Sequence, residues 1–339
     1  MDISFFTYGE RPCLIYPRAL GTLEHLLTRN FACPSGDVTS LNLWRQLKKV
    51  SEGINFIHKS LETQHLDLKP GNILIFERGG SSVKKIENGS GPASPLSTSS
   101  TRSPLPGNFI SDAIFMIGDF GHRSVVTPGA AEWGPPDGPH NRFELQTNEA
   151  NELYDHWSFG AILLEAAVYD RARESDEGSD DIAVNTFRHK RANLDQGLTP
   201  VINTKLYVLG ENGKNGLKRT VSDQIANMET LEDYKLGESE NGYTRMPAKF
   251  YRDIAGDISR LLSISPKKRR SENGIMSIEP YGYYREALRT NPASFSHLIS
   301  QSGLISPSSE HFRAENNNSS VAPPNGAARS LDLNQRETL

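Results

Sequence analysis

The stretch "HLDLKPGN" at residues 65–72 places acidic, basic and amide side chains within a few positions of one another. Phosphoryl transfer requires little covalent chemistry from a protein. It needs a carboxylate that orients a hydroxyl and accepts its proton, oxygen ligands for Mg²⁺, and a cation near the moving phosphate. Asp67 suits the first role, Asn72 the second and Lys69 the third. The stretch continues into the apolar residues "NILIF", so we expect a loop that leads into a strand.

A second carboxylate, Asp119, stands in the motif "GDFG" at the end of the next apolar segment, "AIFMI". If this segment and "NILIF" pair as a hairpin, Asp119 returns beside Asn72. Carboxylate and amide oxygens are the hard ligands that Mg²⁺ prefers. The sequence therefore predicts a magnesium site formed by Asn72 and Asp119 in one pocket.

Hydrophobic periodicity indicates the elements around this site. Residues 40–58 carry apolar side chains at alternating steps of three and four, which predicts an amphipathic helix with Ser40 as a candidate N-cap. Residues 152–170 are apolar nearly all round and predict a buried helix, and residues 250–262 return to helical spacing. Residues 1–28 predict two short strands, around "ISFFTY" and "CLIYP", followed by "GTLEHLL".

Composition excludes several classes of protein. The 339 residues are 36% hydrophobic, enough for a core, and a formal net charge of −4 gives no argument for nucleic-acid binding. Cys13 and Cys33 are too few for a disulfide framework or a four-ligand zinc site, which fits a reducing compartment. The N-terminus does not have the pattern of a signal peptide, and no run is apolar enough to span a bilayer. We expect a soluble intracellular protein, cytoplasmic or nuclear, with no nucleic-acid or membrane partner.

Three segments have a different character. Residues 79–108 are rich in Ser, Pro and Gly, and residues 301–339 are similarly polar, so we expect a disordered insertion and a disordered tail. Residues 171–247 are mixed and charged, which predicts an irregular insertion with some helix.

Taken in order, these motifs resemble the eukaryotic protein kinase family. "HLDLKPGN" is similar to the catalytic-loop pattern H-R-D-L-K-P-x-N except at Leu66, and "GDFG" is similar to the magnesium-binding motif. "WGPPD" resembles the end of the activation segment, "YDHWSFG" the helix that anchors the large lobe, and "LLSISPKKRRS" a late large-lobe segment. "CLIYPRALGTLEHLL" resembles the hinge strand and the helix after it. The resemblance covers most of residues 5–170 and 248–275.

This resemblance implies an α+β protein-kinase-like fold, with a mostly helical large lobe and a remnant of the small-lobe sheet. Residues 1–20 would form the small-lobe remnant and hinge. Residues 21–300 would form the large lobe, with insertions at 79–108 and 171–247, and residues 301–339 would be the tail.

The resemblance also implies a serine/threonine kinase that uses ATP and Mg²⁺ and acts on a protein substrate. Asp67 and Lys69 would be its catalytic residues. The cofactor contacts would come from four residues, of which the last two would bind the metal: Ile15, Tyr16, Asn72 and Asp119.

The chain departs from the family pattern where the family binds phosphates. No glycine-rich loop precedes the hinge match, and the first lysine, Lys48, already lies in the predicted helix, so the clamp lysine is absent. By this match the first three small-lobe strands are missing. Ala130 stands where serine/threonine kinases have a threonine, and the span from Asp119 to Asp137 is short for an activation segment.

These features support two principal hypotheses. The first is a kinase that is impaired in this chain because the glycine loop and the clamp lysine are missing. The second is a non-catalytic, kinase-like scaffold that binds a protein partner, which the missing lysine and Ala130 favour. Phosphotransfer to a small molecule is a weaker third hypothesis, because such relatives usually lack the "PPD" and "KKRRS" elements.

Three residues leave structural alternatives open. Asp155 is either an N-cap or, as in the family, the residue that holds the backbone of the catalytic loop. The "KKRR" run is either a nuclear-localisation patch or, as the resemblance implies and as we favour, the place where Arg269 pairs with Asp137. We expect His65 to be a packed residue rather than a base or a metal ligand.

Overall fold

The computed structural model describes part of the chain, and these residues all belong to one of its two units, residues 1–295. The described ranges are 4–9, 11–15, 17–28, 37–77, 109–110, 113–119, 132–136, 148–172, 183–193, 204–208, 215–232 and 246–290. Several sequence-based expectations fall outside them: the disordered segments 79–108 and 301–339, and the roles of Tyr16, Ala130 and Asp137.

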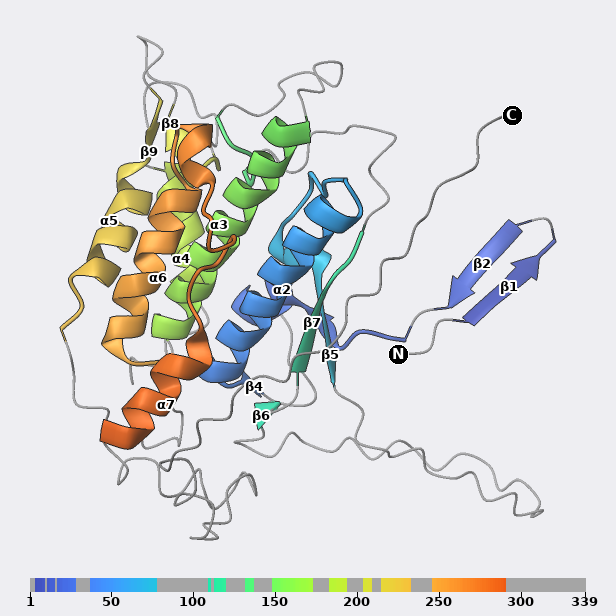
Figure 1. The fold of residues 1–339 in the computed structure, drawn as a ribbon, viewed down its shortest axis with the longest axis horizontal. Coiled ribbons are helices and arrows are strands. Elements are labelled where there is room, and N and C mark those ends of the chain that lie inside the picture. Colours follow the sequence, from blue (N-terminus) through green and yellow to red (C-terminus); the bar gives the residue numbers. More distant parts are fainter. Residues whose placement is uncertain are drawn as a thin grey trace, which may run out of the picture. The chain divides into compact units, whose positions relative to one another are not determined.

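Helices make up most of the described part of the chain (Figure 1). Their bounds are α1 (Leu23–Thr28), α2 (Ser40–Ser60), α3 (Asn148–Ala172), α4 (Ala183–Asn193), α5 (Arg219–Glu229), α6 (Ala248–Leu261) and α7 (Pro280–Thr290), with short 3₁₀ helices η1 (Pro70–Asn72) and η4 (Pro266–Arg269). The strands are β1 (Ser4–Tyr8), β2 (Arg11–Ile15), β3 (Gly21–Thr22), β4 (Asp37–Val38), β5 (Ile73–Glu77), β6 (Phe109–Ile110), β7 (Ala113–Ile117), β8 (Tyr207–Val208) and β9 (Gly216–Leu217).

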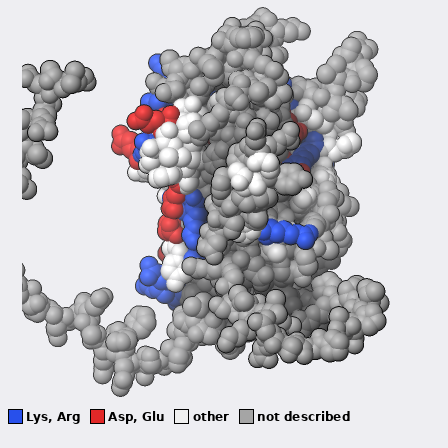
Figure 2. Space-filling model, turned by 90° about the vertical axis from the view of Figure 1, so that its right-hand side faces the viewer, with Lys and Arg blue, Asp and Glu red and all other residues white. Residues whose placement is uncertain are grey.

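The described residues therefore form a mostly helical α+β structure with small sheets. The largest of these, in the order β3–β5–β7, is antiparallel, and β1 pairs with β2 as a separate two-stranded sheet. No helix in the described ranges is long and apolar enough to cross a membrane. On the face shown in Figure 2, acidic and basic side chains of the described residues lie next to one another rather than in separate patches.

The predicted hairpin is confirmed. β5 and β7 pair in antiparallel register, with Ile73 opposite Ile117 and Glu77 opposite Ala113. Alternate residues of both strands, such as Ile73 and Phe115, are buried beneath the sheet, where α2 packs on β7. The two strands thus return the chain from the end of η1 to the residues just before Asp119.

The helix predicted at residues 40–58 is present as α2, but its N-cap is Thr39 and not Ser40. The Thr39 side chain accepts a hydrogen bond from the Asn42 backbone at 3.2 Å. Ser40 already lies within the helix, and its hydroxyl donates to Oδ2 of Asp170 at 2.6 Å. Both residue types cap helices well, and a buried partner 130 positions away on α3 takes the serine.

The predicted buried helix is α3, whose middle turns are fully enclosed. Trp157, Phe159 and the run from Ala161 to Leu164 are 0% exposed. α6 packs closely against α3 at Gly160, where a Cβ atom would lie only 2.7 Å from Cβ of Leu261. Glycine at this position therefore allows the two helices to approach each other.

The region expected to be an irregular insertion contains the predicted helix and also contributes to the core. α4 and α5 bury apolar side chains against the rest of the domain, among them Val184, Phe187, Val221, Ile225 and Met228. α4 packs on α3, and α5 packs on α6 (Figure 1). The mixed composition of residues 171–247 hid these faces, because each helix contributes only a few apolar positions.

Candidate functional site

Asp67, Lys69 and Asn72 lie together in the 65–72 loop, as the sequence predicted. Nζ of Lys69 is 2.7 Å from Oδ2 of Asp67, and Nδ2 of Asn72 donates to the same oxygen at 3.0 Å and to the Asp67 carbonyl at 2.8 Å. Asp67 and Asn72 are buried, whereas the Lys69 side chain is 31% exposed. Because Nδ2 of Asn72 faces Asp67, Oδ1 is the amide atom that could bind a metal.

Asp119 follows β7 and lies next to this loop through the backbone. The Gly118 backbone nitrogen donates to the Asn72 carbonyl at 2.8 Å. Asp119 is exposed and has a φ of 61°, a left-handed conformation that Asp tolerates better than most residues. The chain segments that carry Asn72 and Asp119 therefore meet, and binding of one metal ion by both side chains stays a prediction.

Asp155 holds the backbone of the 65–72 loop. It lies well inside α3 and is not an N-cap; its Oδ2 accepts from the His65 backbone nitrogen and its Oδ1 from that of Leu66, both at 2.8 Å. Leu66 has a φ of 62°, which is unfavourable for a residue with a Cβ atom. The two hydrogen bonds to a fully buried carboxylate fix the loop in this conformation.

His65 is a packed residue, as expected, and it links the two halves of the site. Its Nε2 lies 2.8 Å from the Gly118 carbonyl, and its Nδ1 accepts from the Asp67 backbone nitrogen at 3.3 Å. Since a carbonyl can only accept, Nε2 carries the proton. The ring therefore joins the loop of Asp67 to the residue before Asp119.

Two further histidines surround Asp155, and sequence reasoning missed both. Nε2 of His58, in α2, lies 2.8 Å from Oδ2 of Asp155, and the His156 ring lies 5.7 Å from the His58 ring. Burial, and next the neighbouring His58, lower the pKa of His156 to about 4. The only sequence signal was that His58 and His156 each lie in a segment that periodicity predicts as helix.

The predicted nucleotide contacts at residues 15 and 16 are not described, since the structure gives only the backbone of Ile15. The outer face of the β3–β5–β7 sheet offers an apolar row instead. Leu74 and Met116 are the cross-strand neighbours that form it, and the polar Thr22 lies opposite Leu74 on β3; Leu74 is half-buried, and Met116 is 39% exposed. Leu74 packs against Gly118, so this row borders the polar residues of the site.

The "KKRR" run does not form a continuous exposed basic patch. Arg269 is 0% exposed, donates from Nε to the Ser263 carbonyl at 2.9 Å, and stacks on the Trp157 ring at 5.0 Å. This burial favours a structural role for Arg269. Its proposed partner, Asp137, lies outside the described residues.

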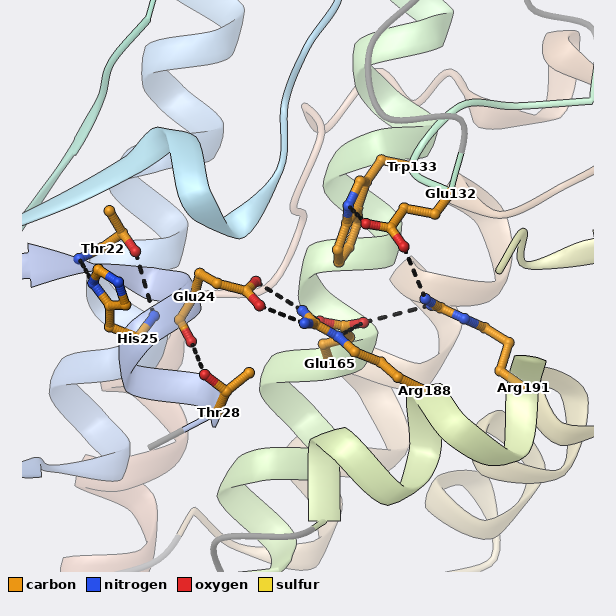
Figure 3. Close-up of polar contacts among 9 residues, drawn as sticks. All are labelled: Thr22, Glu24, His25, Thr28, Glu132, Trp133, Glu165, Arg188 and Arg191. Carbon is orange, nitrogen blue, oxygen red and sulfur yellow. Dashed lines mark hydrogen bonds and ion pairs between the residues drawn. The ribbon is translucent and has the colours of Figure 1, made fainter. Parts of the chain in front are cut away.

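A partly buried ionic cluster near the loop was also missed by sequence reasoning (Figure 3). Arg188 of α4 bridges two carboxylates: its guanidinium donates to Glu24 of α1 and to Glu165 of α3. Burial raises the pKa of the fully enclosed Glu165, and the hydrogen bonds from Arg188 oppose that effect. We call this set, with Glu132, Trp133 and Arg191, the α4 clamp.

Comparisons with known proteins give no assignment. No family model matches the chain, and a search of curated proteins finds no significant match.

Proposed function

We propose that this chain is a kinase-like large lobe that transfers the terminal phosphate of ATP to a serine or threonine hydroxyl of a protein. The ordered motifs in the sequence motivate this proposal. One observation carries it: a buried Asp67 is hydrogen-bonded to Lys69 and Asn72 in a loop that is tied through Gly118 to Asp119.

The described side chains fit the roles that phosphoryl transfer needs. Asp67 would orient the acceptor hydroxyl and take its proton, and Lys69, already paired with Asp67, would place a positive charge near the transferred group. The oxygens of Asn72 and Asp119 suit Mg²⁺, which would neutralise phosphate charge when bound. The apolar row at Leu74 and Met116 would give the base of the nucleotide a surface on which to rest.

The phosphate contacts are weaker in this chain than in the family it resembles, because the sequence has no glycine-rich loop and no clamp lysine. Each charge-assisted contact to a phosphate is worth about 1.5–3 kcal/mol, so these losses weaken binding by several orders of magnitude. We expect this chain alone to bind Mg-ATP weakly or not at all.

Calorimetric titration of Mg-ATP tests the proposal. The measurement compares the 339-residue chain with a form extended at its N-terminus by a glycine-rich loop and a clamp lysine. The extended form should bind Mg-ATP and transfer phosphate, Asp119→Ala should abolish binding, and Asp67→Asn should abolish transfer while binding persists. The matched control is Asp223→Asn, in the exposed pair with Arg219 on α5. If the folded extended form binds Mg-ATP equally well with and without Asp119→Ala, the proposal is refuted. Micromolar binding of Mg-ATP by the 339-residue chain alone would refute the expectation that this chain binds it weakly.

A non-catalytic scaffold is the second candidate, favoured by the same missing phosphate contacts and by Ala130. It would use the large-lobe surface to bind a protein partner. The two candidates differ in one result: a scaffold transfers no phosphate even when the extended form binds Mg-ATP.

A further inference from the structure

The 132–136 segment packs beside the candidate site. At Gly134 an added Cβ atom would lie 2.7 Å from the hydroxyl oxygen of Tyr154, so the segment rests directly on that side chain. Tyr154 is the chain neighbour of Asp155, whose carboxylate accepts hydrogen bonds from the backbone nitrogens of His65 and Leu66. The 132–136 segment and the 65–72 loop therefore contact neighbouring residues of α3.

Trp133 anchors this segment to α3, and its ring faces two arginines of α4 (Figure 3). Its carbonyl accepts from Oγ of Ser158 at 2.9 Å, and its side chain is only 4% exposed. The guanidinium carbons of Arg188 and Arg191 lie 5.5 and 6.0 Å from the indole centroid. Among the aromatic rings, an indole attracts a nearby cation most strongly.

Arg188 fixes the position of α4 relative to α1 and α3. Its Nε donates to Glu165 at 2.9 Å, and its Nη2 donates to Glu24 at 2.8 Å. Arg188 is held by carboxylates from two different helices, a geometry that the planar fork of arginine fits better than lysine does. The start of α1, which carries Glu24, is itself fixed by reciprocal side chain-to-backbone hydrogen bonds between Thr22 and His25, each 3.3 Å long.

Arg191 lies over two rings, Phe187 at 5.6 Å and Trp133 at 6.0 Å, and beside two carboxylates. It is 1% exposed, and its nearest carboxylate atoms lie at 3.5 Å on Glu165 and 3.9 Å on Glu132. Its buried Nε has no hydrogen-bond partner among the described residues. Trp133 in turn donates from its indole nitrogen to Glu132 at 2.9 Å, so the two side chains share one carboxylate.

We propose that Arg188 and Arg191 are positioning residues for the candidate site. Through Trp133 they hold the 132–136 segment in place from α4. A protein segment that brings its hydroxyl to Asp67 then rests on a surface whose position α4 determines. The substrate side of this inference rests on the proposed function, whereas the clamp itself does not.

Quenching of Trp133 fluorescence by acrylamide tests the clamp in the full chain. The chain has three tryptophans, and Trp44 and Trp157 are 0% exposed, so the difference between each protein and its Trp133→Phe counterpart reports Trp133 alone. Arg188→Met and Arg191→Met should each raise the quenching constant of Trp133 about threefold or more, because the segment is then released locally. The matched control, Arg219→Met, alters a side chain on α5 that is 90% exposed and should leave the constant unchanged.

A milder variant keeps the test decisive if either arginine variant fails to fold. Glu132→Ala removes a side chain that is 34% exposed, together with the acceptor of the Trp133 indole nitrogen. It too should raise the quenching constant. If Trp133 stays as protected as in the wild type in the folded variants, the clamp is refuted.

The substrate side has its own readout, with dephosphorylated casein as the protein probe. In a form that transfers phosphate, Arg191→Met should raise KM for casein about tenfold and leave KM for ATP unchanged. An unchanged KM for casein, or an equal rise in both KM values, would overturn the positioning role. If no form transfers phosphate, the proposed function fails, and the nucleotide-free quenching experiment still decides the clamp.

Discussion

Removal of the Asp155 carboxylate should destabilise the fold more than any exposed substitution. The carboxylate is fully buried and accepts hydrogen bonds from the backbone nitrogens of His65 and Leu66 and from the His58 ring, each at 2.8 Å. In Asp155→Ala the two backbone donors lose a buried acceptor, and each loss costs about 1–3 kcal/mol. We expect the free energy of unfolding to fall by about 4 kcal/mol, a large share of the 5–15 kcal/mol typical of a domain.

Asp155→Asn separates the hydrogen bonds from the volume of the side chain. The Asn side chain keeps one oxygen acceptor but turns its NH₂ group toward a second donor. We therefore expect the free energy of unfolding to fall by about 2 kcal/mol. Asp223→Ala is the control, because that carboxylate is 61% exposed and lies 3.6 Å from its partner, a pair worth less than about 0.5 kcal/mol.

Urea denaturation followed by circular dichroism measures these differences, provided that the m-value is unchanged. Amide hydrogen exchange at His65 and Leu66 should accelerate in Asp155→Ala at urea concentrations well below the transition. If the free energy of unfolding of Asp155→Ala lies within 1 kcal/mol of the wild-type value, the reasoning about the loop is wrong, because the loss of even one acceptor costs about 1 kcal/mol or more. A loss of stability in Asp155→Ala with none in Asp155→Asn would show that side-chain volume, and not hydrogen bonding, is what matters.

Three further predictions follow from single described residues. Glu62 has a φ of 48° just after α2, so Glu62→Gly should raise the free energy of unfolding by about 0.5–1 kcal/mol in urea titrations, and a loss would contradict the assigned backbone conformation. Gly160→Ala should cost about 1–3 kcal/mol by forcing α3 and α6 apart, whereas Gly256→Ala, with open space around it, should be neutral or stabilising. The folded pKa of His156 is lowered to about 4, below its unfolded value near 6.5, so the unfolded state binds the extra proton and stability should fall as pH drops through this window. The charged or titratable groups around this ring are His58, Asp155 and Arg260. Because His156→Gln removes the titrating group, the wild type should lose more stability than this variant between about pH 6.5 and 4.5. Parallel profiles of stability against pH for the two proteins would count against a buried neutral His156.

Local sequence patterns determined the chemistry-bearing groups and the elements that carry them. The spacing of Asp67, Lys69 and Asn72 within one loop predicted that these side chains lie together, and the structure shows them hydrogen-bonded to one another. The strands β5 and β7 and the buried helix α3 were predictable for the same reason. Each depends on neighbours a few residues apart, where the period of a strand or helix is already visible in the sequence.

The tertiary structure alone decided which distant groups meet. Ser40 and Thr39 are both good N-caps, and the choice between them depends on Asp170, 130 residues further along the chain. Arg188 finds Glu24 across 164 residues, and no local pattern marks either side chain as the other's partner. Periodicity tells which face of a helix is buried, but packing between elements sets which group covers this face. The clamp could therefore be seen only once the helices were placed, and only their placement decided between the two roles that the sequence offered for Asp155.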